Sequence, residues 1–480
     1  MNASKLLSPI CAGMLALALS AIAYAQNSPV PAPPPAAGDP LPAAKPGPPK
    51  EADVPNALPA EGKPATGDAA KPTDKDRVSL DEIRRFVSVF RAVKQAYVDP
   101  IDDQQLMRAA IRGLLTDLDP HSAYLDHDES RSLNEMASGA YDGLGLEVLQ
   151  QPDRSLLVIA PIDDTPAARA GIKSGDLIVR IDGKPISADN VDAAVDSMRG
   201  APGTPIALTI ERENAPEPIT FTLMRETIRI SSVRVRALES GYAYLRISTF
   251  QADTGAEVQK KLKALQATEK SPLKGLVMDL RSNPGGLLNA AVEVADAFLD
   301  SGVIVSTKGR LGYANAEFSA RRGDLLAGAP IVILADSGTA SAAEVLAGAL
   351  RDHQRALVMG SPSFGKGSVQ TVLPMDNGDS IKLTTARYYT PSGASIQASG
   401  IVPDVALAED AELAARGDRP PTVRERDLPG HLRGDREDGA IATPVSVPEV
   451  DEVDDFAVRE ALTLLKGLSV FRKTSAPKAG

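Results

Sequence analysis

Two residues in the second half of the chain could together perform acyl transfer. Ser341 follows an apolar segment at residues 331–335 and stands where a helix is expected to begin. Lys366 comes later, in the glycine-flanked loop GSPSFGKG. The 480-residue chain has four histidines, and none stands in an obvious catalytic frame with a serine and an aspartate. A nucleophilic serine would therefore need a lysine as its base, which is a known variant of serine hydrolase sites.

The position of Ser341 suits a nucleophile. A serine between a strand and a helix is exposed at the carboxyl end of the strand, where the unpaired N–H groups of the helix favour negative charge. The N–H of Ala342 would then be one donor to an oxyanion, and the N–H of Gly285 or Gly286 in a glycine turn would be the second. The alternative is structural, because Ser341-Ala342-Ala343-Glu344 also has the pattern of a helix capping box.

Lys366 needs burial if it is to act as a base, because removal from water lowers the pKa of a lysine. The glycines on both sides would allow close packing of the backbone. One alternative is a solvated loop lysine. Another is a phosphate-binding loop, since GxxxxGK is present, but Gly367 occupies the position of the Mg²⁺-binding Ser or Thr. A strand rather than a helix is also expected to follow, which argues against a phosphate loop.

Composition excludes several classes of function. The net charge is −11, tryptophan is absent and no basic stripe is visible, so nucleic acid is not an expected partner. The single cysteine, Cys11, lies in the apolar N-terminal stretch, so no disulfide framework is expected. No cofactor and no metal site are expected either.

The N-terminus has the pattern of an export signal. Lys5 precedes an apolar stretch at residues 10–23, and Ala23-Tyr24-Ala25 fits a small-x-small cleavage site. We therefore expect residues 1–25 to be a signal peptide and the mature protein to be periplasmic, with an uncleaved membrane anchor as the alternative. Residues 26–76 are rich in Pro and Ala and are expected to be a disordered linker.

The remaining chain is expected to be a multidomain α/β protein. Residues 77–136 are predicted to be helical, with a helix capped by Ser79 and a second at 103–118. Residues 140–228 show short strands at 155–160, 175–183 and 205–211, with helices at 166–172 and 191–198. That order resembles a PDZ domain, in which a peptide C-terminus binds a glycine-containing loop and adds a strand to the sheet. The alternative is a small β-rich domain with ordinary turns.

The resemblance to a PDZ domain assigns peptide binding to the loop formed by Gly143, Leu144, Gly145 and Leu146. From residue 232 to 410, strands at 242–247, 276–280 and 331–335 alternate with helices at 288–299 and 342–351, which predicts an α/β core of βαβ type. Residues 411–480 are predicted to be a charged tail with one amphipathic helix at 455–468.

Five motifs together resemble the carboxyl-terminal processing peptidases, also called tail-specific proteases. They are YDGLGLEV, DLRSNPGG, GTASAAEVLAGAL, SFGKGSVQ and GIVPDV, and the similarity covers about residues 80–410. The resemblance implies a serine endopeptidase with Ser341 as nucleophile, Lys366 as general base and Gln370 as the residue that orients the lysine. Many members have a serine at the position of Ala343, but that hydroxyl is not the nucleophile. Asp352 is read as structural.

The substrates implied are proteins or peptides with apolar C-termini. The alternative from another class is a catalytically silent PDZ scaffold for periplasmic proteins. The helix at 455–468 is expected to associate with a second copy of the chain, or else to pack on the helices at 79–118. The family resemblance adds that some members form multimers and that some are activated by helical-repeat lipoproteins.

Overall fold

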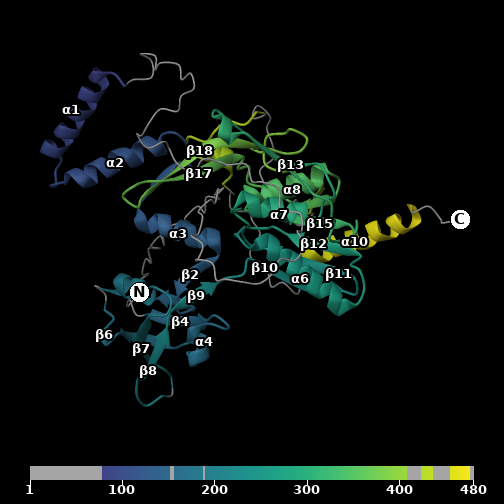
Figure 1. Cartoon of the computed structure of the whole chain (residues 1–480), viewed down its shortest axis with the longest axis horizontal. Coiled ribbons are helices and arrows are strands. Elements are labelled where there is room, and N and C mark those ends of the chain that lie inside the picture. Colours follow the sequence, from purple (N-terminus) through teal and green to yellow (C-terminus); the bar gives the residue numbers. More distant parts are fainter. Residues whose placement is uncertain are drawn as a thin grey trace, which may run out of the picture.

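The computed structural model describes residues 78–151, 156–187, 190–213, 215–407, 423–435 and 455–475. The expected signal peptide and the linker lie outside these residues. The described chain is a multidomain α/β structure in which an N-terminal helical region, a PDZ-like domain and an α/β core follow one another (Figure 1).

The N-terminal helices α1 (Leu80–Ala96) and α2 (Asp103–Thr116) form near the predicted positions. Ser79 caps α1 as expected, because its side chain accepts a hydrogen bond from the Glu82 N–H at 3.2 Å. The helix α1 buries none of its residues, and Figure 1 shows it set apart from the body of the protein. A third helix, α3 (His127–Ser138), leads from this region toward the PDZ-like domain.

The PDZ-like domain is a six-stranded sheet around its own apolar cluster. Its strands are β3 (Leu146–Gln150), β4 (Leu156–Pro161), β5 (Leu177–Ile181), β6 (Lys184–Pro185), β7 (Pro205–Glu211) and β8 (Ile219–Met224), and its helices are α4 (Pro166–Ala170) and α5 (Val191–Met198). The strand β3 lies at one end of the order β3-β4-β5-β7-β8. A separate pair, β2 (Ala140–Gly143) with β9 (Glu226–Arg229), joins the domain to the rest of the chain.

A six-stranded sheet forms the centre of the α/β core. Its order is β10 (Val233–Glu239), β11 (Tyr242–Ile247), β12 (Gly275–Asp279), β15 (Ile331–Ala335), β16 (Ala356–Gly360) and β19 (Val405–Ala406). All neighbours are parallel except β10 with β11. The central strands β12 and β15 are buried along their whole length, as expected for parallel strands covered on both faces.

Helices cover both faces of this sheet. On one face lie α6 (Thr254–Glu269), α7 (Leu288–Asp296) and α8 (Ala342–Asp352), which pack with alternate strand residues such as Leu276, Met278 and Ile333. The residues between them, among them Val277 and Val332, face the other side. The period of two along each strand therefore produces two apolar faces, and each needs its own cover.

The second face is covered by α10 (Phe456–Ser475), which corrects the expected role of the C-terminal helix. Its residues Ala457, Val458, Ala461 and Leu465 are buried against the sheet, and Figure 1 shows the helix beside β12 and β15. The apolar stripe is therefore filled by the chain's own core, neither by a second copy nor by the helices at 79–118. Because a charged stretch precedes the helix, the sequence pattern did not indicate that the helix packs on the central sheet.

A second, antiparallel sheet lies beside the core and was not expected. It contains β1 (Ala123–Leu125), β18 (Ser380–Tyr389), β13 (Val303–Gly309), β14 (Ala316–Ser319) and β17 (Ser368–Pro374). Two short 3-10 helices, η2 (Gly312–Ala314) and η3 (Glu425–Asp427), complete the described elements. None of the helices in the described ranges is long and apolar enough to cross a membrane.

Candidate active site

Three loops meet at one edge of the parallel sheet. They follow β12, β15 and β16, which are hydrogen-bonded neighbours in that order. Because parallel strands end at the same edge, residues 280–286, 336–341 and 361–367 are brought together there. Direct backbone bonds join them, since the Ala340 N–H donates to Asn283 O at 2.9 Å and the Phe364 N–H donates to Thr339 O at 2.9 Å.

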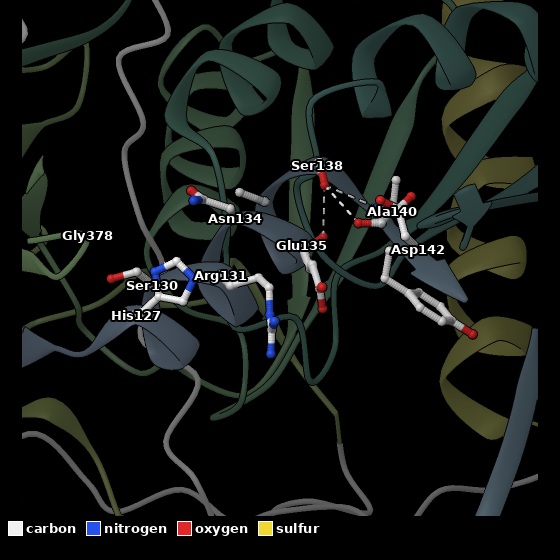
Figure 2. A pocket seen from close by; sticks show the side chains of 11 residues that line it. His127, Ser130, Arg131, Asn134, Glu135, Ser138, Ala140, Asp142 and Gly378 are labelled. Atoms are coloured by element: carbon white, nitrogen blue, oxygen red, sulfur yellow. Dashed lines mark hydrogen bonds between the residues drawn. The ribbon is translucent and has the colours of Figure 1, made fainter. Parts of the chain in front are cut away.

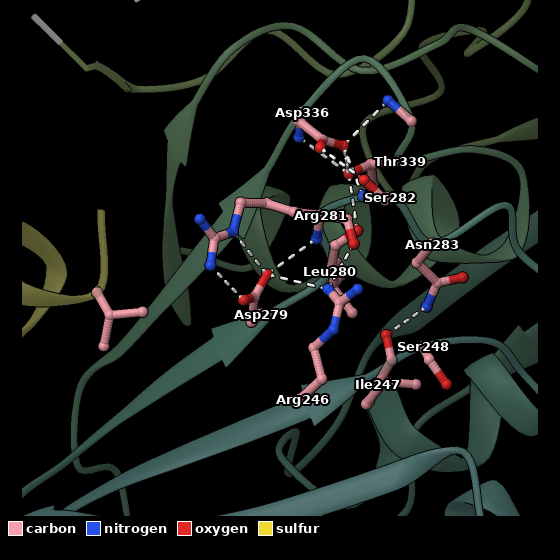
Figure 3. Close-up of polar contacts among 12 residues, drawn as sticks. Arg246, Ile247, Ser248, Asp279, Leu280, Arg281, Ser282, Asn283, Asp336 and Thr339 are labelled. Carbon is pink, nitrogen blue, oxygen red and sulfur yellow. Dashed lines mark hydrogen bonds and ion pairs between the residues drawn. The ribbon is translucent and has the colours of Figure 1, made fainter. Parts of the chain in front are cut away.

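Asp336 fixes the first two loops to each other. Its Oδ1 accepts hydrogen bonds from the Ser282 N–H at 2.7 Å and the Gly338 N–H at 3.0 Å. The Thr339 hydroxyl lies 3.1 Å from the same carboxylate and 2.8 Å from Leu280 O. Figure 3 shows these contacts between the two turns. The turn that carries Ser341 is therefore held by buried polar contacts on the side of β12.

Ser341 occupies a strained backbone position. Its φ is 54° and its ψ is −114°, which a residue with a side chain rarely adopts. The side chain is 1% exposed, and α8 begins at the next residue, as predicted. The N–H of Ala342 has no acceptor among the described residues, as expected for the first turn of a helix.

Glu344 connects the serine to the lysine loop. One carboxylate oxygen, Oε2, accepts hydrogen bonds from the Ser341 N–H at 2.7 Å and from the Lys366 N–H at 2.9 Å. The other, Oε1, accepts from the Gly365 N–H at 2.7 Å and from the Ser363 hydroxyl. The bond to Ser341 is one half of the expected capping box. The three bonds to the lysine loop show that this side chain also places Lys366 beside the serine turn.

Burial raises the pKa of Glu344 to about 7, while the hydrogen bonds from Ser363 and from three backbone N–H groups favour the carboxylate and act in the opposite direction. The side chain is wholly buried, and its four donors satisfy it without a positive partner. The sequence indicated Glu344 only as a capping residue. Its contacts with residues 363–366 depend on the loop that follows the next strand, β16 (Ala356–Gly360), and local sequence does not show them.

Lys366 is 2% exposed, so it is not a solvated loop lysine. Burial lowers its pKa to about 7, and the charge of Lys382 lowers it further, while Glu425, Glu344 and Asp119 act in the opposite direction. An added Cβ at Gly367 would lie 2.3 Å from Gln397 N, which shows why the position after the lysine is a glycine. The loop therefore brings a buried lysine with a lowered pKa to the serine turn.

Gln370 lies on β17, four residues after the lysine, and is 1% exposed. Its amide nitrogen donates to the Ser368 hydroxyl at 3.0 Å and to the Thr384 hydroxyl at 3.3 Å. Its Oε1 is buried and has no hydrogen-bond partner among the described residues. The side chain is thus held with an acceptor available, and its action on Lys366 stays a prediction.

Gly285 and Gly286, the two glycines expected to complete an oxyanion site, differ in whether their backbone N–H groups already have an acceptor. The Gly285 N–H already donates to Asn283 Oδ1 at 2.8 Å, so Gly285 does not offer the free donor that the sequence analysis assigned to it. The Gly286 N–H has no acceptor within the described ranges. Gly286 has a φ of 133°, and a Cβ there would lie 2.2 Å from Phe250 O, so only glycine fits. Gly286 and Ala342 remain the candidate donors.

Tyr388 is a neighbour of Ser341 that the sequence analysis missed. Its side chain is 1% exposed on β18, and the Ser341 side chain is the neighbouring polar group that acts on its pKa, in the lowering direction. Burial raises the pKa of Tyr388 above its usual range, so the hydroxyl stays protonated at neutral pH. No local pattern marks this tyrosine, because its position depends on the pairing of the second sheet.

Asp352 and the histidines take other roles. Asp352 Oδ2 accepts a hydrogen bond from the Ser392 N–H at 2.9 Å, which agrees with a structural residue. His353 Nε2 contacts Val303 O at 2.7 Å, and His121 Nε2 lies 2.7 Å from Glu425 Oε2. No hydrogen bond joins a histidine to Ser341 in the described part of the chain. Nor does any group of three or more His, Cys, Asp or Glu within it lie close enough together to hold a metal ion.

The expected peptide-binding loop lies at the start of the PDZ-like sheet. Leu144 is 3% exposed and Gly145 has a φ of 76°, with Thr165 so close that a Cβ would collide with it. The N–H groups of Leu144 and Gly145 have no acceptor within the described segments. Gly143 belongs to β2 and pairs with Glu226, whereas Leu146 begins β3. Within the same segments β3 pairs only with β4, so its other edge is open for an added strand.

A cavity of about 530 Å³ lies elsewhere, between α3, β2 and Gly378. Figure 2 shows Ser138 at its edge, where the hydroxyl bonds to Glu135 O and Ala140 O, each at 3.1 Å. None of its lining residues is a predicted site residue.

Three family models match this chain. Residues 241–407 match peptidase family S41, residues 157–212 match a PDZ domain, and residues 58–129 match the N-terminal domain of the activating protease CtpB. The first match spans the three loops that carry Ser341 and Lys366, and the second lies within the PDZ-like domain. Together they define a serine-type peptidase with a PDZ domain.

Relatives that match most of this chain agree with these family models. The carboxy-terminal-processing protease of Bartonella bacilliformis is 43% identical over 399 residues, which are 82% of this chain and 91% of that protein. The carboxy-terminal processing protease CtpA of Bacillus subtilis is 34% identical over 66% of this chain and 67% of its own. The chain belongs to peptidase family S41. Among solved structures, a photosystem II D1 C-terminal processing protease is 31% identical, covers 69% of this chain and 94% of its own, and has a TM-score of 0.40.

Proposed function

We propose that this protein is a periplasmic serine endopeptidase that processes or degrades proteins recognised by their C-terminal tails. The observation that carries the proposal is the Glu344 carboxylate, which binds the backbone N–H groups of both Ser341 and Lys366. A buried lysine with a pKa of about 7 beside a strained serine turn is suited to the activation of a hydroxyl nucleophile.

In the proposed mechanism, neutral Lys366 accepts the proton of the Ser341 hydroxyl as Oγ attacks the scissile carbonyl. The N–H groups of Ala342 and Gly286 stabilise the oxyanion, and the lysine ammonium then protonates the leaving amine. A water molecule, deprotonated by the same lysine, hydrolyses the acyl-enzyme. Gln370 Oε1 accepts a hydrogen bond from the ammonium and orients it. No cofactor takes part.

The proposed route for substrates begins at the PDZ-like domain. A peptide carboxylate would bind the free N–H groups of Leu144 and Gly145, and the preceding residues would pair with the open edge of β3. The partly buried apolar residues beside it, Leu146, Val148 and Val195, favour apolar residues at the substrate C-terminus.

Export is proposed from the first 25 residues, whose charged, apolar and small-x-small regions follow the order of a signal peptide. An activating helical-repeat lipoprotein remains a proposed partner. The proposed surface for self-association is the pair of helices α1 and α2. Support comes from their exposed apolar residues, such as Leu80 at 68% and Leu114 at 66%, whereas the stripe of α10 is already covered.

The test is a pair of substitutions, Ser341→Ala and Lys366→Ala. Each should reduce cleavage of a casein-like substrate by about 10³-fold or more while the fold is kept, because members of one catalytic unit fail together. Covalent labelling of the wild-type protein by a fluorophosphonate should map to Ser341 and should be lost in both variants. Near-native turnover in Lys366→Ala would overturn the proposed base, and absence of labelling would favour the silent PDZ scaffold.

A further inference from the structure

The short segment at residues 423–435 lies against the loop that carries the catalytic lysine. The Glu425 N–H donates to Phe364 O at 3.2 Å, and Arg424 Nη2 donates to Pro362 O at 3.0 Å. Arg424 is 2% exposed and Glu425 is fully buried. Part of the predicted charged tail is therefore built into the active-site region, which its composition did not indicate.

Gln397 connects this segment to the residue after the lysine. Its side chain is fully buried, and its Oε1 accepts a hydrogen bond from the Gly367 N–H at 3.0 Å. Its Nε2 donates to Glu425 Oε1 and to Leu432 O, each at 2.9 Å. Because Gly367 packs directly on the Gln397 backbone, a shift of this glutamine must also shift the lysine loop.

Glu425 is contacted by two residues that lie far apart in the sequence. Its Oε1 is bound by Gln397, and its Oε2 lies 2.7 Å from His121 Nε2. His121 is itself held by a 2.8 Å bond from its backbone N–H to Asp119 Oδ1. A carboxylate that is buried with all of these partners resists displacement, since the removal of one partner would leave buried polar atoms unsatisfied.

We propose that Gln397 and Glu425 are positioning residues for Lys366. Glu425 binds the side chain of Gln397, and Gln397 in turn binds the backbone of Gly367, the residue after the lysine. The proposal rests on the function proposed above. It adds that the base is placed from two sides, by Glu344 on α8 at its own N–H and by the Gln397–Glu425 pair at the next residue.

The same pair acts on the charge of the lysine. Among the described residues, the charged groups that act most on the pKa of Lys366 are Lys382 on β18, Glu425 on η3, Glu344 on α8 and Asp119 before β1. Lys382 disfavours the ammonium, whereas the three carboxylates favour it. Neutralisation of Glu425 should therefore make Lys366 easier to deprotonate, which a purely structural role would not do.

The first experiment measures the rate of fluorophosphonate labelling of Ser341 against pH in the full-length protein. In Glu425→Gln, which keeps the size of the side chain, the pH at which the labelling rate falls on the acid side should decrease by about half a unit or more. We call this part of the profile the acid limb. The matched control is Asp427→Asn on the same short helix. It removes the same charge from an exposed residue that is not among those facing Lys366, and it should leave the limb in place.

The second variant, Gln397→Met, keeps the volume and removes the hydrogen bonds. Its labelling rate at the plateau should fall by about tenfold or more, because the lysine loop loses its fixed geometry. The KM for a peptide substrate should stay near the wild-type value. Gln266→Met, on α6, removes a glutamine hydrogen bond away from the site and should change neither quantity.

An unshifted limb in folded Glu425→Gln, together with native rates in Gln397→Met, would overturn the inference. If Glu425→Gln does not fold, Gln397→Met decides alone. Failure of the proposed function is recognised separately, because labelling would then persist in Lys366→Ala.

Discussion

The two sites of this protein are built in opposite ways. At the peptidase site, Ser341, Glu344 and Lys366 are all buried, and the carboxylate between them is bound by four donors. At the PDZ-like site, β3 has an open edge, and the N–H groups of Leu144 and Gly145 have no acceptor within the described residues. Chemistry requires groups fixed before the substrate arrives, whereas recognition of a chain end requires positions left empty for it.

Outside Ser341 and Lys366 themselves, the largest effect should follow from loss of the carboxylate at the peptidase site. In Glu344→Gln, only one side-chain oxygen remains to accept four hydrogen bonds, so buried N–H groups lose their acceptor at a cost of about 1–3 kcal/mol each. The Ser341 turn and the lysine loop should separate slightly, and kcat should fall by about 10²-fold. Steady-state kinetics with a short peptide, together with thermal unfolding, would measure both.

The matched change in the other domain is Asp176→Asn. Asp176 is also buried, but its carboxylate pairs with Arg212 and lies in the PDZ-like domain. This change should destabilise that domain and leave kcat unaltered. Equal losses of kcat in the two variants would remove the distinction between a site for chemistry and a site for recognition.

The second prediction concerns pH. Since burial lowers the pKa of Lys366 to about 7 and the proposed mechanism uses the neutral amine, kcat/KM should rise about tenfold per unit below pH 7 and level off above it. A limb near 10.4, the ordinary value for lysine, would contradict the burial. The ordinary pKa of histidine lies close to that of the buried lysine, so the acid limb of the pH–rate profile should also persist in His353→Gln. Lys366→Arg should be inactive at every pH.

The third prediction tests the recognition site. Amidation of the C-terminus of a good peptide substrate removes the charge that the Leu144–Gly145 loop would bind. The KM should rise by about tenfold, in line with the loss of a charged hydrogen bond, while kcat stays the same. Titration calorimetry on the Ser341→Ala protein provides the binding constants without turnover. Equal binding of the free acid and the amide would remove the tail-reading role.

The smallest effect on activity should come from substitutions in the terminal helices α1 and α10. These two helices differ in how much of their apolar surface is buried. Leu465 of α10 is fully buried, so Leu465→Ala should cost about 2–5 kcal/mol of unfolding free energy. Val470→Ala on the same helix and Phe86→Ala on α1 replace residues that are 62% and 48% exposed, so each should cost far less. Light scattering should give an unchanged mass for Leu465→Ala. A loss of mass would return α10 to a role in association.

Local sequence patterns were sufficient to predict elements that are determined by neighbouring residues. The strands at 242–247 and 331–335 and the start of α8 at Ala342 were predicted correctly, because apolar runs and helix caps are encoded by neighbouring residues. Parallel neighbours then place their carboxyl ends together, and this is why Ser341 and the loop of Lys366 lie at the same edge of the sheet.

The missed features depend on contacts between distant segments. Tyr388 reaches Ser341 through the pairing of the second sheet, and Glu425 reaches the lysine loop from beyond residues that the structure does not describe. The N–H of Gly285 or Gly286 was predicted to be the second oxyanion donor, but the Gly285 N–H already donates to Asn283 Oδ1. The stripe of α10 was visible, but the sheet face that it covers was not.

The placement of α10 and of residues 423–435 has a consequence for biosynthesis. The ribosome makes these segments after the rest of the described core, yet one covers a face of the central sheet and the other supports the lysine loop. We therefore expect a nascent chain to have no proteolytic activity until both segments have been translated. A chain arrested before residue 423 should not react with a fluorophosphonate, and labelling of such a chain would show that the late segments are dispensable. A protease with this arrangement would stay silent while it is being synthesised.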